Sequence, residues 1–101
     1  MSQQSAWAFI HKRFVEILDA MDAFEMDEDL EELNAQLEDT LFFMENLDPE
    51  ELESSEEMRE TLEEVEELLA EYQALSLQRP ELRQRVLELQ MALEMAKRNL
   101  N

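Results

Sequence analysis

The amino-acid sequence predicts an all-α protein: a small bundle of three to four antiparallel helices, or a long helical hairpin. Apolar residues recur at alternating spacings of three and four along most of the chain, as on one face of a helix. No segment shows the alternation of apolar and polar residues that is typical of a strand. Because 101 residues suffice for one core, we expect a single helical domain spanning residues 1–101.

Two apolar stripes predict the first two helices. The first stripe, which Leu18 widens, consists of Trp7, Ile10, Phe14, Ile17, Met21 and Phe24. The second predicts a helix from about Asp27 to Leu47 and consists of Leu30, Leu33, Leu37, Leu41, Met44 and Leu47. A break near Glu25–Asp27 is inferred from charge, since acidic residues favour a helix N-terminus.

The connection after the second helix carries a strong helix-start signal. Asp48 is suited to cap a helix, Pro49 to its first position, and Glu51 to close a capping box. A second capping signal follows at Ser54-Ser55-Glu56-Glu57. Together the two signals predict a one-turn helix and then the start of a new helix at Ser54 or Ser55.

The last two predicted helices are separated by Pro80. The third helix carries Met58, Leu62, Val65, Leu69 and Tyr72, and the fourth carries Leu82, Val86, Leu89, Leu93, Ala96 and Leu100. Since proline disfavours helix at the preceding residue, we expect a kink or short turn at Leu77–Arg79. The residues in the middle of the four stripes should be buried: Phe14, Leu37, Val65 and Leu89.

Acidity is concentrated in the middle of the chain, which has a formal net charge of −19. Residues 27–72 hold twenty carboxylates and one base, Arg59, whereas residues 73–101 are mildly basic. This balance disfavours direct binding to nucleic acid or to an anionic membrane, so we expect a protein partner. No apolar stretch approaches the length of a membrane span and none resembles a signal peptide, so we expect a cytoplasmic location.

The composition excludes most catalytic and metal sites. Without glycine there is no phosphate-binding loop, and without cysteine, with His11 as the one histidine, a zinc or iron–sulfur site lacks ligands. His11 lies at the edge of the first stripe beside Lys12 and Arg13, with no serine or aspartate placed to form a relay. We therefore expect a non-enzymatic protein with no cofactor, no metal and no catalytic residue.

The second and third helices carry repeated glutamates, for which two interpretations stay open. On the third helix they form one face, which consists of Glu56, Glu57, Glu60, Glu63, Glu64, Glu67 and Glu71. A solvated face that keeps the protein soluble is the simpler interpretation. The alternative is a mimic of nucleic-acid phosphates, which would make the chain an acidic DNA-mimic inhibitor of a DNA-binding protein.

Five apolar residues lie outside the core stripes and form the candidate partner-binding site. Leu87, Met91 and Met95 make a second stripe on the fourth helix, and Phe42 and Phe43 flank the second stripe on either side. They either widen the core or contact a partner helix or a second copy of the chain. Methionine suits such a site because its side chain adapts to different partners.

A structural homodimeric coiled coil is a further alternative. Val65, Tyr72, Val86, Leu93 and Leu100 keep one heptad phase across Pro80, as a continuous helix would require. Two observations oppose this alternative. The neighbouring apolar seam of the same two helices shifts by one residue across Pro80. Proline inside a helix would also destabilise it by about 3 kcal/mol.

The layout resembles the small FliT-like flagellar and type III export chaperones. The resemblance covers the two N-terminal helices, the acidic Asp48-Pro49-Glu50-Glu51 connection, the long Met58–Tyr72 helix, and a C-terminal helix behind Arg79-Pro80. It is one of layout, without a diagnostic residue motif. It implies a bundle or hairpin that holds a helix of an export substrate, with the last helix able to cover the groove. We therefore expect a protein-binding adaptor or chaperone-like protein that holds a partner helix in an apolar groove.

Overall fold

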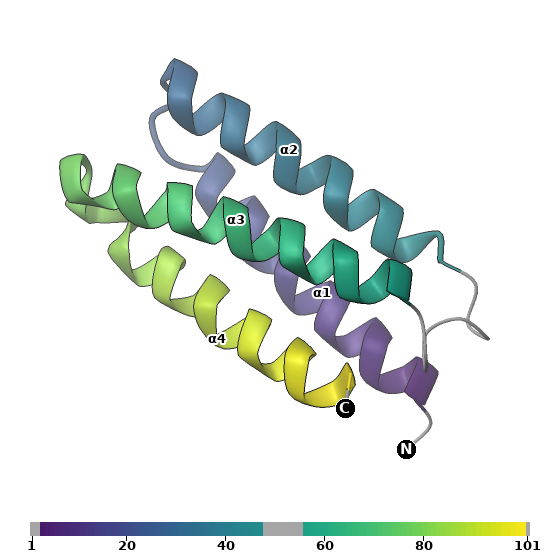
Figure 1. Cartoon of the computed structure of the whole chain (residues 1–101). Coiled ribbons are helices and arrows are strands. Elements are labelled where there is room, and N and C mark those ends of the chain that lie inside the picture. The colour runs from purple at the N-terminus through teal and green to yellow at the C-terminus, as the bar shows by residue number, and fades with distance from the viewer. Residues whose placement is uncertain (1–2, 48–55, 101) are drawn as a thin grey trace.

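A computed structural model describes residues 3–47 and 56–100 and confirms the predicted all-α class (Figure 1). Its helices are α1 (Gln3–Asp22), α2 (Glu28–Glu45), α3 (Glu56–Gln78), the short 3-10 helix η2 (Pro80–Leu82) and α4 (Arg83–Leu100). These described ranges contain no strand. The expected capping signals at Asp48–Glu51 and Ser54–Ser55 lie outside them.

The four α-helices form an antiparallel bundle in which each packs against two others (Figure 1). α1 contacts α2 and α4, and α3 likewise contacts α2 and α4. Consequently α2 and α4 occupy diagonal positions, as do α1 and α3. This is the arrangement of an up-down-up-down four-helix bundle.

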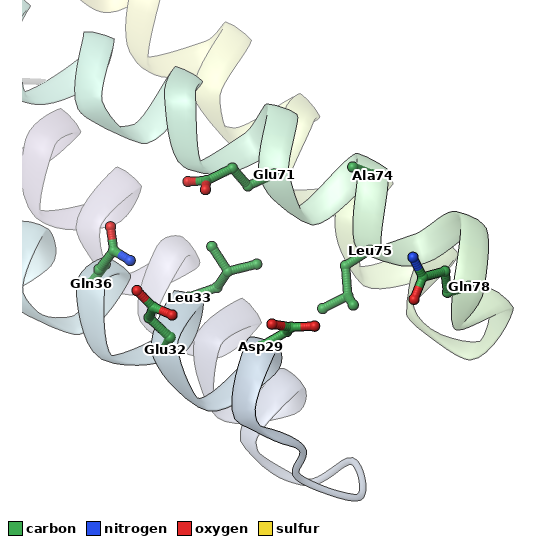
Figure 2. A pocket seen from close by; sticks show the side chains of 8 residues that line it. All are labelled: Asp29, Glu32, Leu33, Gln36, Glu71, Ala74, Leu75 and Gln78. Carbon is green, nitrogen blue, oxygen red and sulfur yellow. The ribbon is translucent and has the colours of Figure 1, made fainter.

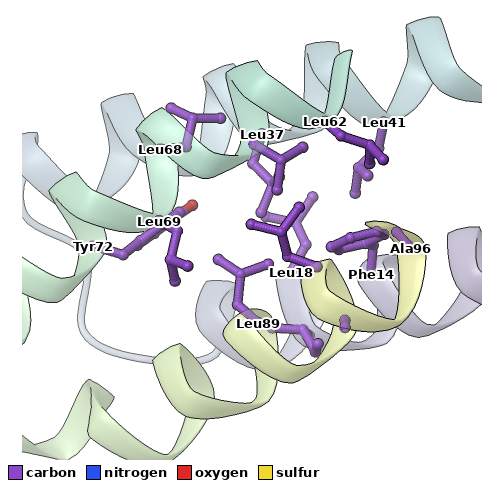
Figure 3. Close-up of a cluster of buried hydrophobic side chains, with 14 of the residues drawn as sticks. Phe14, Leu18, Leu37, Leu41, Leu62, Leu68, Leu69, Tyr72, Leu89 and Ala96 are labelled. Atoms are coloured by element: carbon purple, nitrogen blue, oxygen red, sulfur yellow. The ribbon is translucent and has the colours of Figure 1, made fainter. Parts of the chain in front are cut away.

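The core follows the predicted stripes. Phe14, Leu37, Val65 and Leu89, one from each helix, are fully buried, which confirms their expected burial. Figure 3 shows the centre of this core, where side chains from all four helices meet. Phe24 and Leu100, at the ends of their stripes, are only partly buried against it.

In each of the two described connections, one or two residues determine where a helix ends or begins. Asp27 is the N-cap of α2, and its Oδ1 accepts a hydrogen bond of 2.8 Å from the backbone N–H of Leu30. α3 ends at Gln78, Arg79 leaves the helical conformation, and Pro80 opens η2. A continuous helix through Pro80 is therefore wrong: α3 and α4 fold back on one another, and the heptad phase reflects two separate stripes facing one core.

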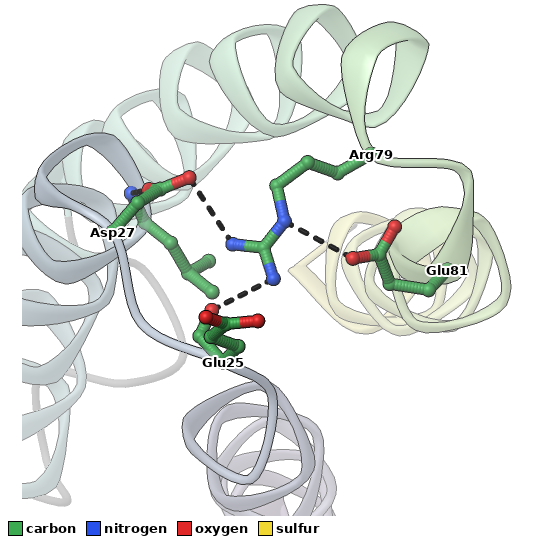
Figure 4. A network of polar contacts seen from close by, with 5 residues as sticks. Glu25, Asp27, Arg79 and Glu81 are labelled. Carbon is green, nitrogen blue, oxygen red and sulfur yellow. Dashed lines mark hydrogen bonds and ion pairs between the residues drawn. The ribbon is translucent and has the colours of Figure 1, made fainter.

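Arg79 joins these two connections at one end of the bundle (Figure 4). Its guanidinium donates to the carbonyl oxygen of Glu25 at 2.7 Å and forms ion pairs with Asp27 at 3.3 Å and Glu81 at 3.2 Å. Only 15% of the Arg79 side chain is exposed. Asp27 thus caps α2 with one oxygen and holds the α3–α4 turn with the other.

A chain of polar side chains crosses the core from α3 to α1. The Tyr72 hydroxyl donates to Asn34 Oδ1 at 2.7 Å, and Asn34 Nδ2 donates to Asp22 Oδ1 at 2.8 Å. Tyr72 and Asn34 are buried, so both need partners inside the protein. Burial, and secondarily the nearby Asp22 carboxylate, raise the pKa of Tyr72 far above its ordinary value.

The raised pKa of Tyr72 predicts a distinct alkaline behaviour. Tyr72 is the one tyrosine of the chain, so the ultraviolet absorbance of tyrosinate reports on this residue alone. In the folded protein we expect no tyrosinate signal at a pH near 11, where the urea-unfolded chain has ionised with a pKa of about 10. Stability should accordingly fall as the pH rises above about 10, because only the unfolded state loses the proton. Ionisation of the folded protein near pH 10 would contradict the buried position of the hydroxyl.

Candidate protein-binding site

The second apolar stripe of α4 lies outside the core. Leu87 and Met91 are 50% and 59% exposed, whereas Met95 is partly buried against the core. The alternative that all three widen the core therefore fails for Leu87 and Met91. Next to Met91 and Met95, on α1, Phe9 is 61% exposed. We call Phe9, Leu87, Met91 and Met95 the α1–α4 face.

A groove between α1 and α4 runs through this face. It consists of two adjoining hollows of about 330 and 350 Å³ that share Phe9, Met95 and Arg98 as walls. Phe9 comes from α1 and the other two residues from α4, so the groove depends on the packing of these two helices. A shallow groove between two packed helices, lined by both apolar and charged side chains, is a surface on which a further helix can pack.

Ion pairs hold the helices around the groove. Arg13 on α1 pairs with Glu88 on α4 at 3.3 Å, and Arg85 pairs with the same carboxylate. On the far side of α4, Lys97 pairs with Glu66 of α3 at 3.0 Å. The groove wall also carries Glu94 and Arg98, which balances its charges.

Phe42 and Phe43 are exposed as well, but they lie on another part of the bundle. Both are on α2, diagonally across the bundle from α4, and Phe42 lines a hollow between α1 and α2 instead. The structure therefore separates the five predicted residues into an α4 group and an α2 pair. It adds Phe9, which the apolar pattern of the sequence does not single out, because only the packing of α1 on α4 places it beside Met91 and Met95.

His11 lies in the α1–α2 hollow, where its Nε2–H donates to the main-chain carbonyl of Leu41 at 3.0 Å. This contact ties α1 to α2. Within residues 3–47 and 56–100, no group of three or more histidines or carboxylates is placed to hold a metal ion.

Acidity occupies the opposite half of the bundle. α2 holds seven carboxylates and no base, and α3 holds eight and Arg59, a net charge of −14 for the pair. For α1 and α4 together the net charge is +1. The groove between α2 and α3 has a volume of about 300 Å³. Figure 2 shows Asp29, Glu32 and Glu71 around Leu33 and Leu75, which also line it.

The acidic half predicts a positive effect of salt on stability. Like charges on neighbouring helices repel one another, and salt screens this repulsion with a Debye length of about 8 Å at physiological ionic strength. We expect Tm to rise by several degrees between low and moderate salt. Changing the exposed residues Glu60, Glu64 and Glu67 to glutamine should raise Tm at low salt and reduce its salt dependence. A Tm that falls with salt would show that the ion pairs around α4 outweigh the repulsion.

No protein-family model, curated protein or solved structure matches the chain. In the part of the chain that the structure describes, no helix combines the length and the apolar character that crossing a bilayer requires.

Proposed function

We propose that this chain is a non-enzymatic, cytoplasmic protein-binding module that holds an amphipathic helix on its α1–α4 face. One observation carries the proposal: Phe9, Met91 and Met95, large apolar side chains from two helices, line one groove, and Leu87 is exposed one turn before Met91 on α4. Contiguous apolar surface of this kind marks interaction sites in soluble proteins.

The geometry of the groove favours a helix as its occupant. Leu87, Met91 and Met95 form a ridge at every fourth residue, and such ridges pack into the corresponding grooves of another helix. Full burial of a side chain of this size contributes about 1.5–3 kcal/mol, so completing the burial of Leu87 and Met91, which are about half exposed, would support a measurable affinity. The balanced charges of the wall suit a helix with nearly neutral flanks.

The resemblance in layout to FliT-like export chaperones points to the same class of function. Those proteins look like bundles or hairpins that hold a helix of an export substrate. By this analogy the partner of the α1–α4 face would be a helix of a protein awaiting export. The resemblance thus indicates a class of partner and not an individual protein.

A designed peptide tests the proposal. The probe is a fluorescent helical peptide with leucines at every fourth position and otherwise alanine and glutamine, so that it carries no charge that the acidic helices could attract. Anisotropy should show saturable binding to the full chain. Changing Met91 and Met95 together to glutamine should weaken binding at least tenfold, or about 1.4 kcal/mol, with helix propensity preserved.

The matched control is the double change of Phe42 and Phe43 to glutamine, which removes two exposed apolar side chains from α2. It should leave the affinity unchanged. Because Met95 contacts the core, the single Met91→Gln variant, at an exposed position, separates lost binding from lost folding. The proposal would be contradicted if the parent chain, the Met91→Gln variant and the double variant at Met91 and Met95 bound the peptide with equal affinity.

The carboxylates on both walls of the α2–α3 groove favour a second candidate function, the binding of a basic protein. In this case the chain would act as an acidic decoy for a nucleic-acid-binding protein. The same peptide with lysines in place of the glutamines tests it. Binding should disappear with added salt and with glutamine at Asp29, Glu32 and Glu71, and should tolerate Met91→Gln. Salt-resistant binding would contradict it.

A further inference from the structure

The apolar stripe on α4 is symmetric about its central residue. Leu87, Met91 and Met95 stand four residues apart, so Met91 has one large apolar neighbour a turn before it and another a turn after it. When a second α4 runs antiparallel with Met91 opposite Met91, Leu87 of each copy falls opposite Met95 of the other. Helices that pack through such i±4 ridges cross at about −50°. The stripe is thus complementary to itself.

The distribution of charge favours the same pairing. α2 and α3 carry −14 between them and would repel their counterparts in another molecule, whereas α1 and α4 carry +1. Two copies that meet through α1 and α4 keep both acidic halves on the outside. Among the described residues, the α1–α4 side combines two exposed apolar side chains, Phe9 and Met91, in one groove with nearly zero net charge, whereas carboxylates from both helices line the α2–α3 groove.

We propose that the α1–α4 face is the interface of a two-fold symmetric homodimer, with Met91 on the symmetry axis and Leu87 packed against Met95 of the other copy. Phe9, on the α1 side of the groove, covers the flank of this contact. The inference rests on the proposed function, because it uses the same face and identifies the bound amphipathic helix as α4 of a second copy. In a two-fold symmetric interface, the same surface patch is buried on both subunits.

Light scattering of the full chain over a range from low micromolar to near-millimolar concentration provides the first test. We expect the mass to rise from the 12.0 kDa of one chain to twice that value. Met91→Lys should raise the dimer dissociation constant at least tenfold, because it places two like charges together on the axis. Phe42→Lys, at a comparably exposed position on α2, is the control and should leave the constant unchanged.

A charge-pair rescue tests the register. Leu87→Lys alone should weaken the dimer, because the introduced ammonium faces apolar Met95 of the other copy. Adding Met95→Glu in the same chain should restore it, since each introduced lysine then faces an introduced glutamate across the interface. Melting curves of each variant establish that it is folded. A folded double variant that stays monomeric would overturn the proposed pairing.

Cysteine cross-linking gives an independent readout, since the chain contains no cysteine of its own. Mildly oxidised Met91→Cys should form a covalent dimer, because the two substituted positions meet at the axis. Phe42→Cys should not. Efficient cross-linking through position 42 and none through position 91 would overturn the interface.

The outcomes separate this inference from the proposed function. A chain that stays monomeric at all concentrations, yet binds the neutral leucine peptide through Met91 and Met95, retains the function and excludes the homodimer. A chain that dimerises with the predicted variant effects but binds no peptide retains the homodimer and excludes the binding of a foreign helix.

Discussion

Replacing Phe14 with alanine should lower the free energy of unfolding by about 3–5 kcal/mol, the range expected for a large aromatic side chain removed from a packed core. Phe14 is fully buried at the centre of the bundle (Figure 3). A loss of this size is a large share of the 5–15 kcal/mol that stabilises a typical small domain. Urea unfolding monitored by circular dichroism measures it.

Phe42→Ala is the matched control, because it makes the same chemical change at a side chain that is 68% exposed. Its effect should stay within about 0.5 kcal/mol, as for most surface substitutions. Equal losses at the two positions would contradict the assignment of the first apolar stripe to the core.

A second pair of substitutions tests the orientation of α4. Leu89→Ala should cost about 2–5 kcal/mol, because Leu89 is fully buried. Leu87→Ala, two residues away on the same helix, should cost less than about 1 kcal/mol in dilute protein, because half of its side chain is exposed. A larger loss of stability for Leu87→Ala than for Leu89→Ala would mean that the face of α4 assigned to solvent is the one that packs on α1 and α3.

The periodic spacing of apolar residues was sufficient to predict all four helices and their buried faces. Phe14, Leu37, Val65 and Leu89 were identified correctly because the side-chain direction on a helix follows directly from sequence position. The break at Asp27 and the turn at Pro80 were likewise predictable from local chemistry. These features depend on residues close together in the chain.

Helix-to-helix placement could not be predicted in the same way. Phe42 and Phe43 looked equivalent to Met91 and Met95 as apolar residues beside a stripe, yet α2 and α4 are diagonal in the bundle. Phe9 looked like part of an ordinary apolar run, yet α1 places it in the groove with Met95. The alternative of a continuous helix through Pro80 is excluded, because residues in one heptad phase can face one core from two antiparallel helices.

Methyl NMR of the methionines tests the central claim, that the α1–α4 face is the interaction surface, most directly. Met91 and Met95 lie on this face, Met21, Met44 and Met58 lie in the core, and Met26 is exposed in the α1–α2 connection. On concentrating the protein, or on adding the neutral leucine peptide, the Met91 and Met95 signals should shift in a saturable way, while Met26 stays unchanged. Saturable shifts at Met26 with none at Met91 and Met95 would contradict the claim.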